Sequence, residues 1–185
     1  MPTVLVPLAQ GCEELEAVTI IDLLRRAGIE VVTASLQAGA VTASRGTVLL
    51  ADTTLDAVLE REFDMIVLPG GLPGARHLED DPRLIAMLQR QQIAERYVAA
   101  ICAAPQVLAS AGLLDGRTAT SYPGVIKTAD YPRVTFVETP VVVDGLVITS
   151  RGPGTAMDFA LQLIELLVNH ERRDDVERAL VRTLH

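Results

Sequence analysis

The sequence predicts an α/β sandwich in which a mostly parallel sheet carries helices on both faces. Strand-like apolar runs alternate with helical patterns along the whole chain, without a linker, a repeat or a low-complexity segment. Hydrophobic residues make up 49% of the 185 residues but aromatic residues only 3%, so Val, Leu, Ile and Ala must build the core. Such a core is typical of buried parallel strands. We therefore expect a single domain over residues 1–185.

The first elements follow this alternation. Thr3–Leu8 is a continuous apolar run, as in a strand that is buried on both faces. Helical spacing of apolar residues predicts a helix over 13–27, which Gly28 ends. The next strand is expected over 29–34, and short strands are expected over 41–50, around a turn at Arg45 and Gly46.

The later elements are marked by turn and cap residues. A buried strand over 64–68 is closed by Pro69-Gly70-Gly71, and Asp81 before Pro82 predicts the start of a helix. The strand over 98–101 leads into Cys102. Residues 135–143 and 146–150 predict a hairpin that turns at Asp144-Gly145.

Two helices are expected near the C-terminus. The spacing of Thr155 and Asp158 resembles a capping box, which would open the first of them. The second is an amphipathic helix over 174–183. The apolar face of the first helix is expected to contain Met157, Ala160, Leu161, Ile164 and Val168.

Composition argues against several classes of partner. The net charge is −8 and the pI is about 4.8, which disfavours nucleic acid and anionic membranes. No apolar stretch approaches the length of a membrane span, and no basic segment precedes the first strand, so we expect no signal peptide. Two cysteines, Cys12 and Cys102, make no disulfide framework, and a reducing, cytoplasmic location is expected.

Cys102 is the most informative residue of the chain. It lies between a strand and the helical run 106–109, in a tight turn that should hold its side chain exposed and strained. The helix N-terminus at this turn would favour a thiolate, and the small residues Ala103 and Ala104 leave room above the sulfur. A buried, inert thiol is the commoner fate of a free cysteine, but this position favours a nucleophile.

Glu16 is a candidate partner for the cysteine. It begins a helical stripe that continues with Ile20, Leu23 and Ala27, which places it at the edge of the buried face. A buried carboxyl tends to keep its proton, which it could donate to a thiolate or use in general acid and base catalysis. The alternative is that Glu16, like Glu13 and Glu14, simply complements the helix N-terminus. We favour that alternative for Glu13 and Glu14 and leave it open for Glu16.

Other residues carry weaker signals. Gly70 and Gly71 could direct backbone N–H groups at an oxyanion, although an ordinary strand-exit turn explains the pair as well. His77 could approach the site but is expected on a helix surface, while His170 and His185 are expected to be solvated. Because the spacing of the histidines suits no metal, and no phosphate-loop or dinucleotide motif is present, we expect no metal and no cofactor. Cys12 is expected to be a small thiol in the first loop, without a nucleophilic role.

Four motifs stand in a characteristic order across nearly the whole chain, at residues 11–16 (GCEELE), 67–71 (VLPGG), 99–105 (AAICAAP) and 149–155 (TSRGPGT). Together they resemble the ThiJ/PfpI superfamily, within it the branch of the Parkinson-disease protein DJ-1 and bacterial YajL. The resemblance implies a flavodoxin-like three-layer sandwich, a homodimer, a reactive Cys102 on a nucleophile elbow and a protonated Glu16 hydrogen-bonded to it. It also implies oxyanion-binding amides at Gly71, Cys102 and Ala103. Arg45 and Pro153 match positions close to the site or to the dimer contact.

The sequence departs from related branches at two positions. Tyr122 precedes Pro123 where some members carry a histidine, and a phenol with a pKa of about 10 is a poor base near neutral pH. YajL-like proteins also lack that histidine. Ala103 follows the cysteine where the protease-like and larger chaperone branches have a histidine, and no downstream His-x-Glu pair completes the triad of glutamine amidotransferases.

The resemblance implies action on small reactive carbonyls, as a glutathione-independent glyoxalase or a protein deglycase-like enzyme, through Cys102 with Glu16. The alternative is a non-enzymatic oxidative-stress sensor or chaperone in which Cys102 is oxidised to sulfenic or sulfinic acid. Whether the chain is an enzyme stays open. A third possibility is a binding domain that catalyses no reaction, but the placement of Cys102 and Glu16 would then be a coincidence. The expected partners are a small carbonyl substrate or modified proteins and a second copy of the chain, with no membrane and no nucleic acid.

Overall fold

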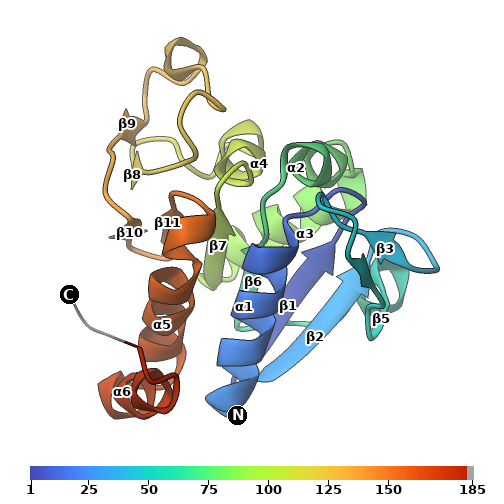
Figure 1. Cartoon of the computed structure of the whole chain (residues 1–185). Helices are drawn as coiled ribbons and strands as arrows, with labels where there is room; N and C mark the ends of the chain where they lie inside the picture. Colours follow the sequence, from blue (N-terminus) through green and yellow to red (C-terminus); the bar gives the residue numbers. More distant parts are fainter. Residues whose placement is uncertain (183–185) are drawn as a thin grey trace.

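The computed structural model describes residues 1–182 and contains a seven-stranded central sheet with helices on both faces (Figure 1). The strand order is β10-β11-β7-β6-β1-β2-β5, and every neighbouring pair is parallel except β10 and β11. This arrangement confirms the predicted α/β class. The strands of this sheet are β1 (Thr3–Leu8), β2 (Glu30–Ser35), β5 (Thr53–Thr54), β6 (Met65–Leu68), β7 (Tyr97–Ile101), β10 (Val141–Asp144) and β11 (Val147–Ser150).

The helices form the two outer layers. One face of the sheet is covered by α1 (Glu14–Arg26) and α5 (Ala156–Leu167), with α6 (His170–Ala179) packed against α5. The other face is covered by α2 (Leu72–Glu79), α3 (Pro82–Ile93) and α4 (Pro105–Ser110). None of the helices in residues 1–182 is long and apolar enough to cross a membrane.

Short elements complete the chain. The strands β3 (Val41–Thr42) and β4 (Val48–Leu49) form the small antiparallel hairpin that was expected around Arg45 and Gly46. The strands β8 (Thr118–Ala119) and β9 (Thr135–Phe136) form a separate parallel pair. Single turns of 3-10 helix are η1 (Leu55–Val58), η2 (Thr128–Asp130) and η3 (Pro153–Thr155).

The apolar run of β1 shows why the sheet is buried on both faces. Val4, Val6 and Leu8 belong to the core cluster under α1 and α5, whereas Leu5 belongs to the cluster under α2, α3 and α4. Side chains alternate between the two faces of a strand, so a strand with two apolar faces must lie between two layers of helix. This double burial places β1 near the centre of the sheet.

The predicted strand over 135–143 is wrong. The hairpin at Asp144-Gly145 is confirmed, because β10 pairs with β11 in antiparallel register. The residues before it, however, do not continue β10, since β9 pairs with β8 instead and Pro140 interrupts the segment. Proline lacks the N–H that a sheet ladder requires.

The predictions around α5 also need correction. The Thr155 hydroxyl bonds to Gly152 and Ser150 and does not cap α5, while Asp158 forms an ion pair with Arg182. Ala160, Leu161 and Ile164 are buried as expected, but Met157 is 44% exposed and Val168 39% exposed. The last helix is α6, which begins before the expected residue 174 and ends at Ala179, before the expected end at Thr183. Thr183 itself, and His185, lie outside the described residues.

Candidate active site

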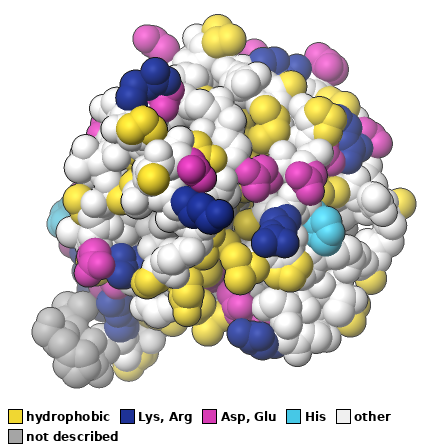
Figure 2. All heavy atoms as spheres, turned by 90° about the horizontal axis from the view of Figure 1, so that it is seen from above, with side chains coloured by type: hydrophobic (Ala, Val, Ile, Leu, Met, Phe, Trp, Pro, Cys, Tyr) yellow, Lys and Arg dark blue, Asp and Glu magenta, His cyan; other side chains and the backbone are white. Residues whose placement is uncertain are grey.

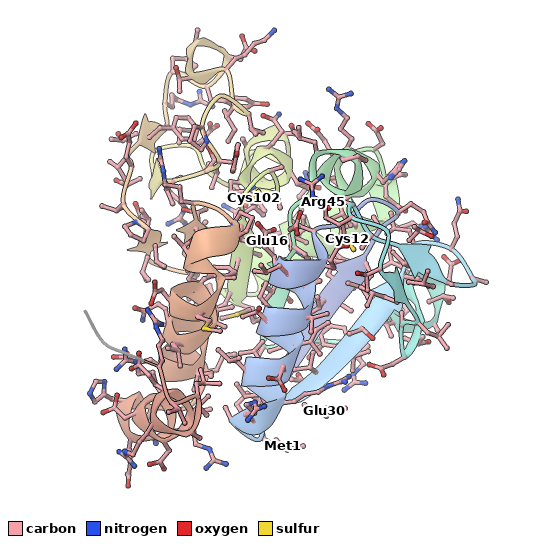
Figure 3. The ribbon with its side chains drawn as sticks, viewed as in Figure 1. Met1, Cys12, Glu16, Glu30, Arg45 and Cys102 are labelled. Atoms are coloured by element: carbon pink, nitrogen blue, oxygen red, sulfur yellow. The ribbon has the colours of Figure 1, made fainter. Side chains whose placement is uncertain are left out.

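The carboxyl ends of β1, β6 and β7 bring three of the four motifs, at residues 11–16, 67–71 and 99–105, to one edge of the sheet. Backbone hydrogen bonds join the loop after β1 to the loop after β6, because Glu13 N donates to the Gly70 carbonyl at 2.9 Å. The Gly70 N–H in turn donates to Oε2 of Glu16 at 2.8 Å. Cys102 and Glu16 therefore lie side by side at this edge (Figure 3). Doubly wound folds collect their ligands at such an edge.

Cys102 forms a strained turn between β7 and α4. Its φ of 64° lies in the left-handed region, which residues other than glycine rarely adopt. Two hydrogen bonds hold the turn: Cys102 N donates to the Ser150 carbonyl at 2.9 Å, and Tyr122 N donates to the Cys102 carbonyl at 2.8 Å. The strain agrees with the sequence prediction, but the exposure does not, since Cys102 is only 8% exposed.

Glu16 is completely buried in the first turn of α1. Its Oε1 has no hydrogen-bond partner among the described residues, and the carboxyl lies next to Cys102 above Gly70. Burial raises the pKa of the carboxyl to about 7, opposed by the interaction with the Cys102 thiol and by the hydrogen bond from the Gly70 N–H. The buried-carboxyl interpretation is therefore the one that the structure supports for Glu16.

The Cys102 thiol holds its proton more tightly than the sequence predicted. Burial raises its pKa to about 12, and so does the negative charge of an ionised Glu16, while the N–H groups of Gly71 and Ala103 lower it. The turn alone therefore does not make a thiolate at neutral pH. A thiolate becomes favourable only when Glu16 keeps its proton, so the two groups act as one proton-sharing pair.

Gly70 has a role that the sequence did not predict, because the Gly70-Gly71 pair was expected only to offer N–H groups to an oxyanion or to form a strand-exit turn. A Cβ at Gly70 would lie 2.6 Å from the Cβ of Cys102 and 2.6 Å from Oε2 of Glu16. Only glycine leaves room for the cysteine and the carboxyl to meet above it. The N–H group of its neighbour Gly71 lowers the pKa of the Cys102 thiol.

Glu13 and Glu14 do more than complement the helix N-terminus. The Glu14 carboxylate accepts the backbone N–H groups of Arg45 at 3.0 Å and Thr47 at 3.3 Å, and Glu13 accepts the Ser44 hydroxyl at 2.8 Å. Desolvation alone would raise the pKa of Glu14, but these backbone hydrogen bonds outweigh it and lower the pKa to about 2. Both acids thus hold the β3–β4 hairpin, and with it Arg45, beside the start of α1.

Two other candidate residues lie near the site without joining the pair. Tyr122 is half exposed, and its ring packs against Gly152, so its contact with the elbow is through the backbone. Pro153 begins the 3-10 helix η3 that follows β11.

Cys12 and His77 have structural roles and lie outside the Cys102–Glu16 pair. Burial, followed by the charge of Glu14, raises the pKa of Cys12 to about 11, which agrees with an inert thiol. His77 lies on α2 and its Nδ1 hydrogen-bonds to the Gln10 carbonyl at 2.9 Å, so it supports the first loop from the helix surface. Within residues 1–182 no cluster of three His, Cys, Asp or Glu side chains could hold a metal ion.

Comparisons with known proteins identify the family of the chain. The model of the DJ-1/PfpI family matches residues 2–166. Protein DJ-1 homolog A of Arabidopsis thaliana is 44% identical over 181 residues, which are 97% of this chain but 46% of the plant protein, so the chain spans less than half of that relative. Glutathione-independent glyoxalase DJR-1.2 of Caenorhabditis elegans is 32% identical over 171 residues, with 92% of this chain and 91% of the relative covered.

Solved structures are similar over the full chain. Drosophila melanogaster DJ-1beta superposes with a TM-score of 0.94 at 41% identity, and 99% of each chain is covered. A structure described as Toxoplasma gondii DJ-1, oxidized, superposes with a TM-score of 0.93 at 42% identity, covering 100% of each chain.

Proposed function

Because this chain belongs to the DJ-1/PfpI family, we propose that Cys102 and Glu16 form a catalytic pair that converts small α-oxoaldehydes to 2-hydroxy acids without glutathione. The observation that carries the proposal is the buried Glu16 carboxyl, which lies next to Cys102, is held by the Gly70 N–H and keeps an Oε1 without a hydrogen-bond partner among the described residues. A relative named as a glutathione-independent glyoxalase supports the choice of reaction.

The reaction balances without a cofactor, because one carbon is oxidised while its neighbour is reduced. The Cys102 thiolate adds to the aldehyde carbon and forms a hemithioacetal, and the Glu16 proton neutralises the new oxyanion. The resulting Glu16 carboxylate removes the proton from that carbon and returns it to the adjacent carbon, which leaves a thioester of the 2-hydroxy acid. Water then cleaves the thioester and restores the thiol.

The backbone around the sulfur suits the charge that develops in this sequence. The backbone N–H groups of Gly71 and Ala103 lower the pKa of the Cys102 thiol, which supports a role for them in binding the oxyanion that forms on the attacked carbon. Loss of one such donor typically costs about 3 kcal/mol of transition-state stabilisation. The limited exposure of Cys102 favours free, small carbonyls over adducts on folded proteins, the deglycase alternative.

The experiment is consumption of methylglyoxal by the purified protein, with lactate measured as the product. Wild type is expected to form lactate, Cys102→Ser to form none and Glu16→Gln to lose at least about 100-fold in kcat/KM, since general acid and base catalysis contributes that much. Cys12→Ser is the matched control and should stay within about twofold of wild type, because that thiol is buried and inert. Lactate formation by Cys102→Ser would refute the proposal.

Oxidation of the same sulfur is the second candidate function. A structural relative is described as oxidized, and the two N–H groups at the sulfur could bind the oxygens of a sulfinic acid. Two free thiols suit a reducing compartment such as the cytoplasm, where such a change would report oxidative stress. Mass spectrometry after mild peroxide should find oxidation at Cys102 before Cys12. The reverse order would contradict a sensor role for Cys102.

A second copy of the chain is the partner that the surface favours. Leu15 and Val18 are exposed on α1, and Val48 and Leu50 are exposed at β4. The Glu14 carboxylate joins the β3–β4 hairpin to the start of α1, so these apolar side chains belong to neighbouring elements. We call these four residues the apolar patch. Exposed apolar patches mark interfaces, and we propose a homodimer through this one.

A further inference from the structure

A cavity of about 280 Å³ adjoins the Cys102 turn on the side of α2 and α4. Leu72, which follows Gly71, and Ala103 both line it. The cavity therefore reaches Ala103, whose backbone N–H is one of the two groups proposed to hold the oxyanion. One water occupies about 30 Å³ in the liquid. By that measure the cavity has room for a substrate chain that extends beyond the two carbonyl carbons.

One wall of the cavity is held in place by side-chain hydrogen bonds. Nε2 of Gln106 donates to the Tyr131 hydroxyl at 2.9 Å and to Oε1 of Glu79 at 3.2 Å, and the Ser110 hydroxyl donates to the same carboxylate. These bonds tie α2, α4 and the segment around Tyr131 together. The Glu79 carboxylate is thereby engaged with the wall, and the cavity does not depend on a ligand for its shape.

Two basic side chains at the cavity remain without an ion pair. Arg76 lines it from α2, and Lys127, the single lysine of the chain, lines it from the segment before η2. Neither forms a salt bridge with the described residues, whereas Arg83 and Arg117 do. Glu79 and Asp130 also line the cavity, so the lining contains two carboxylates as well as the two basic side chains, and a ligand would meet the positive charge only locally, at Arg76 and Lys127. Figure 2 shows basic and acidic side chains close together on the face that contains the carboxyl edge of the sheet.

We propose that this cavity is a substrate subsite that binds a carboxylate carried on the chain of an α-oxoaldehyde. The inference rests on the proposed function of Cys102, which would hold the carbonyl end while Arg76 and Lys127 receive the acidic end. Arginine and lysine make charge-assisted hydrogen bonds with carboxylates, and the hydrogen-bonded wall gives the cavity its shape before a ligand binds. Acidic α-oxoaldehydes are then the preferred substrate class over neutral ones of equal length.

The test compares an α-oxoaldehyde that ends in a carboxylate on a short aliphatic chain with its methyl-terminated analogue. Wild type is expected to show a kcat/KM for the acid at least about fivefold higher, as expected for partly exposed charge contacts. The double variant Arg76→Gln with Lys127→Gln should lose this preference, and Lys127→Arg should keep it. The double variant Arg90→Gln with Arg178→Gln removes the same charge elsewhere and should retain the wild-type ratio.

A second readout separates the subsite from the chemistry. If wild type consumes neither aldehyde, the proposed function fails, but alkylation of Cys102 by iodoacetate and by iodoacetamide still tests the cavity. The iodoacetate-to-iodoacetamide rate ratio should fall several-fold in the Arg76 and Lys127 double variant and not in the charge-matched control. Equal ratios in all variants, or equal kcat/KM for both aldehydes in wild type, would overturn the subsite.

Discussion

Cys102 and Glu16 are best understood as one titrating unit. Burial disfavours the charged form of each, and the negative charge of one opposes the ionisation of the other. When the pair loses its first proton near neutral pH, the remaining proton is shared between a carboxyl and a thiol. Reactivity at Cys102 then depends on the fraction of the pair in which the proton stays on Glu16.

The same pKa shift predicts a pH-dependent stability. The carboxyl of Glu16 titrates at about 7 in the folded protein and near its ordinary value of 4.5 when unfolded. The folded state therefore binds an extra proton between these values, and its stability falls as the pH rises through them. Relative to Glu16→Gln, which cannot titrate, wild type should lose about 3 kcal/mol of unfolding free energy across this range.

Urea denaturation at about pH 5 and about pH 8, at one fixed protein concentration, measures this difference. The other carboxyls titrate equally in both proteins, so their contributions cancel in the difference between wild type and Glu16→Gln. A difference between wild type and Glu16→Gln that does not change with pH would show that the carboxyl is not desolvated as described.

The proton behaviour of the cysteine could not be predicted from local sequence. The turn and its strain follow from an apolar run that ends in Cys102 and a helical run that begins after it. The burial of the sulfur and the effect of Glu16 on its pKa come from α1, which is remote in sequence. The sequence placed Glu16 at the edge of the buried face of that helix and left its burial open, and the structure shows that it is buried.

At the level of elements, the turn after β6 determines whether Cys102 and Glu16 can lie next to each other. Gly70→Ala would place a Cβ within 2.6 Å of the Cys102 Cβ, so the elbow and the turn must separate. Overpacking of this kind typically costs about 1–3 kcal/mol. We expect Gly70→Ala to lower the melting temperature and to change the rate of Cys102 alkylation.

Gly154→Ala is the matched control for this substitution. No atom lies within 4 Å of the Cβ that it would add, and its φ is not positive. Its stability should stay within about 0.5 kcal/mol of wild type. If both variants behave alike in thermal unfolding and in alkylation, the close approach at Gly70 has no role in the site.

The errors in element prediction have local physical causes. The strand expected over 135–143 was inferred from β-branched residues, but Pro140 and the pairing of β9 with β8 divide it. The capping box failed because Thr155 bonds to Gly152 and Ser150, which its spacing from Asp158 does not reveal. Elements marked by long apolar runs were predicted with small boundary errors, because burial of the run determines where the element forms.

At the level of the whole molecule, the topology explains how distant segments meet. Strands β1, β6 and β7 are neighbours and parallel, so the loops after them must share one edge. A parallel sheet, which the alternation of strands and helices predicts, is enough to explain this shared edge. The cavity beside Ala103 was not predictable, because residues from α2, α4 and the segment before η2 line it together.

The apolar patch predicts the oligomeric state. Leu50 is 80% exposed at the hairpin, and Leu50→Lys with Val48→Lys should shift sedimentation from dimer to monomer, since a charge in an apolar interface is costly. Ile93→Lys replaces a comparably exposed residue, at 84%, on α3 and should leave the dimer intact. A wild-type monomer at micromolar concentration would contradict the proposed dimer.

The pH dependence of Cys102 alkylation by iodoacetamide, in wild type and in Glu16→Gln, tests the proton-sharing pair most directly. The rate in wild type should rise through about pH 7, where the pair loses its first proton, and reach a plateau. Glu16→Gln should lack this step and show a single rise at alkaline pH, because burial still disfavours the thiolate. A step near pH 7 that survives in Glu16→Gln, or an ordinary thiol profile in wild type, would contradict the account.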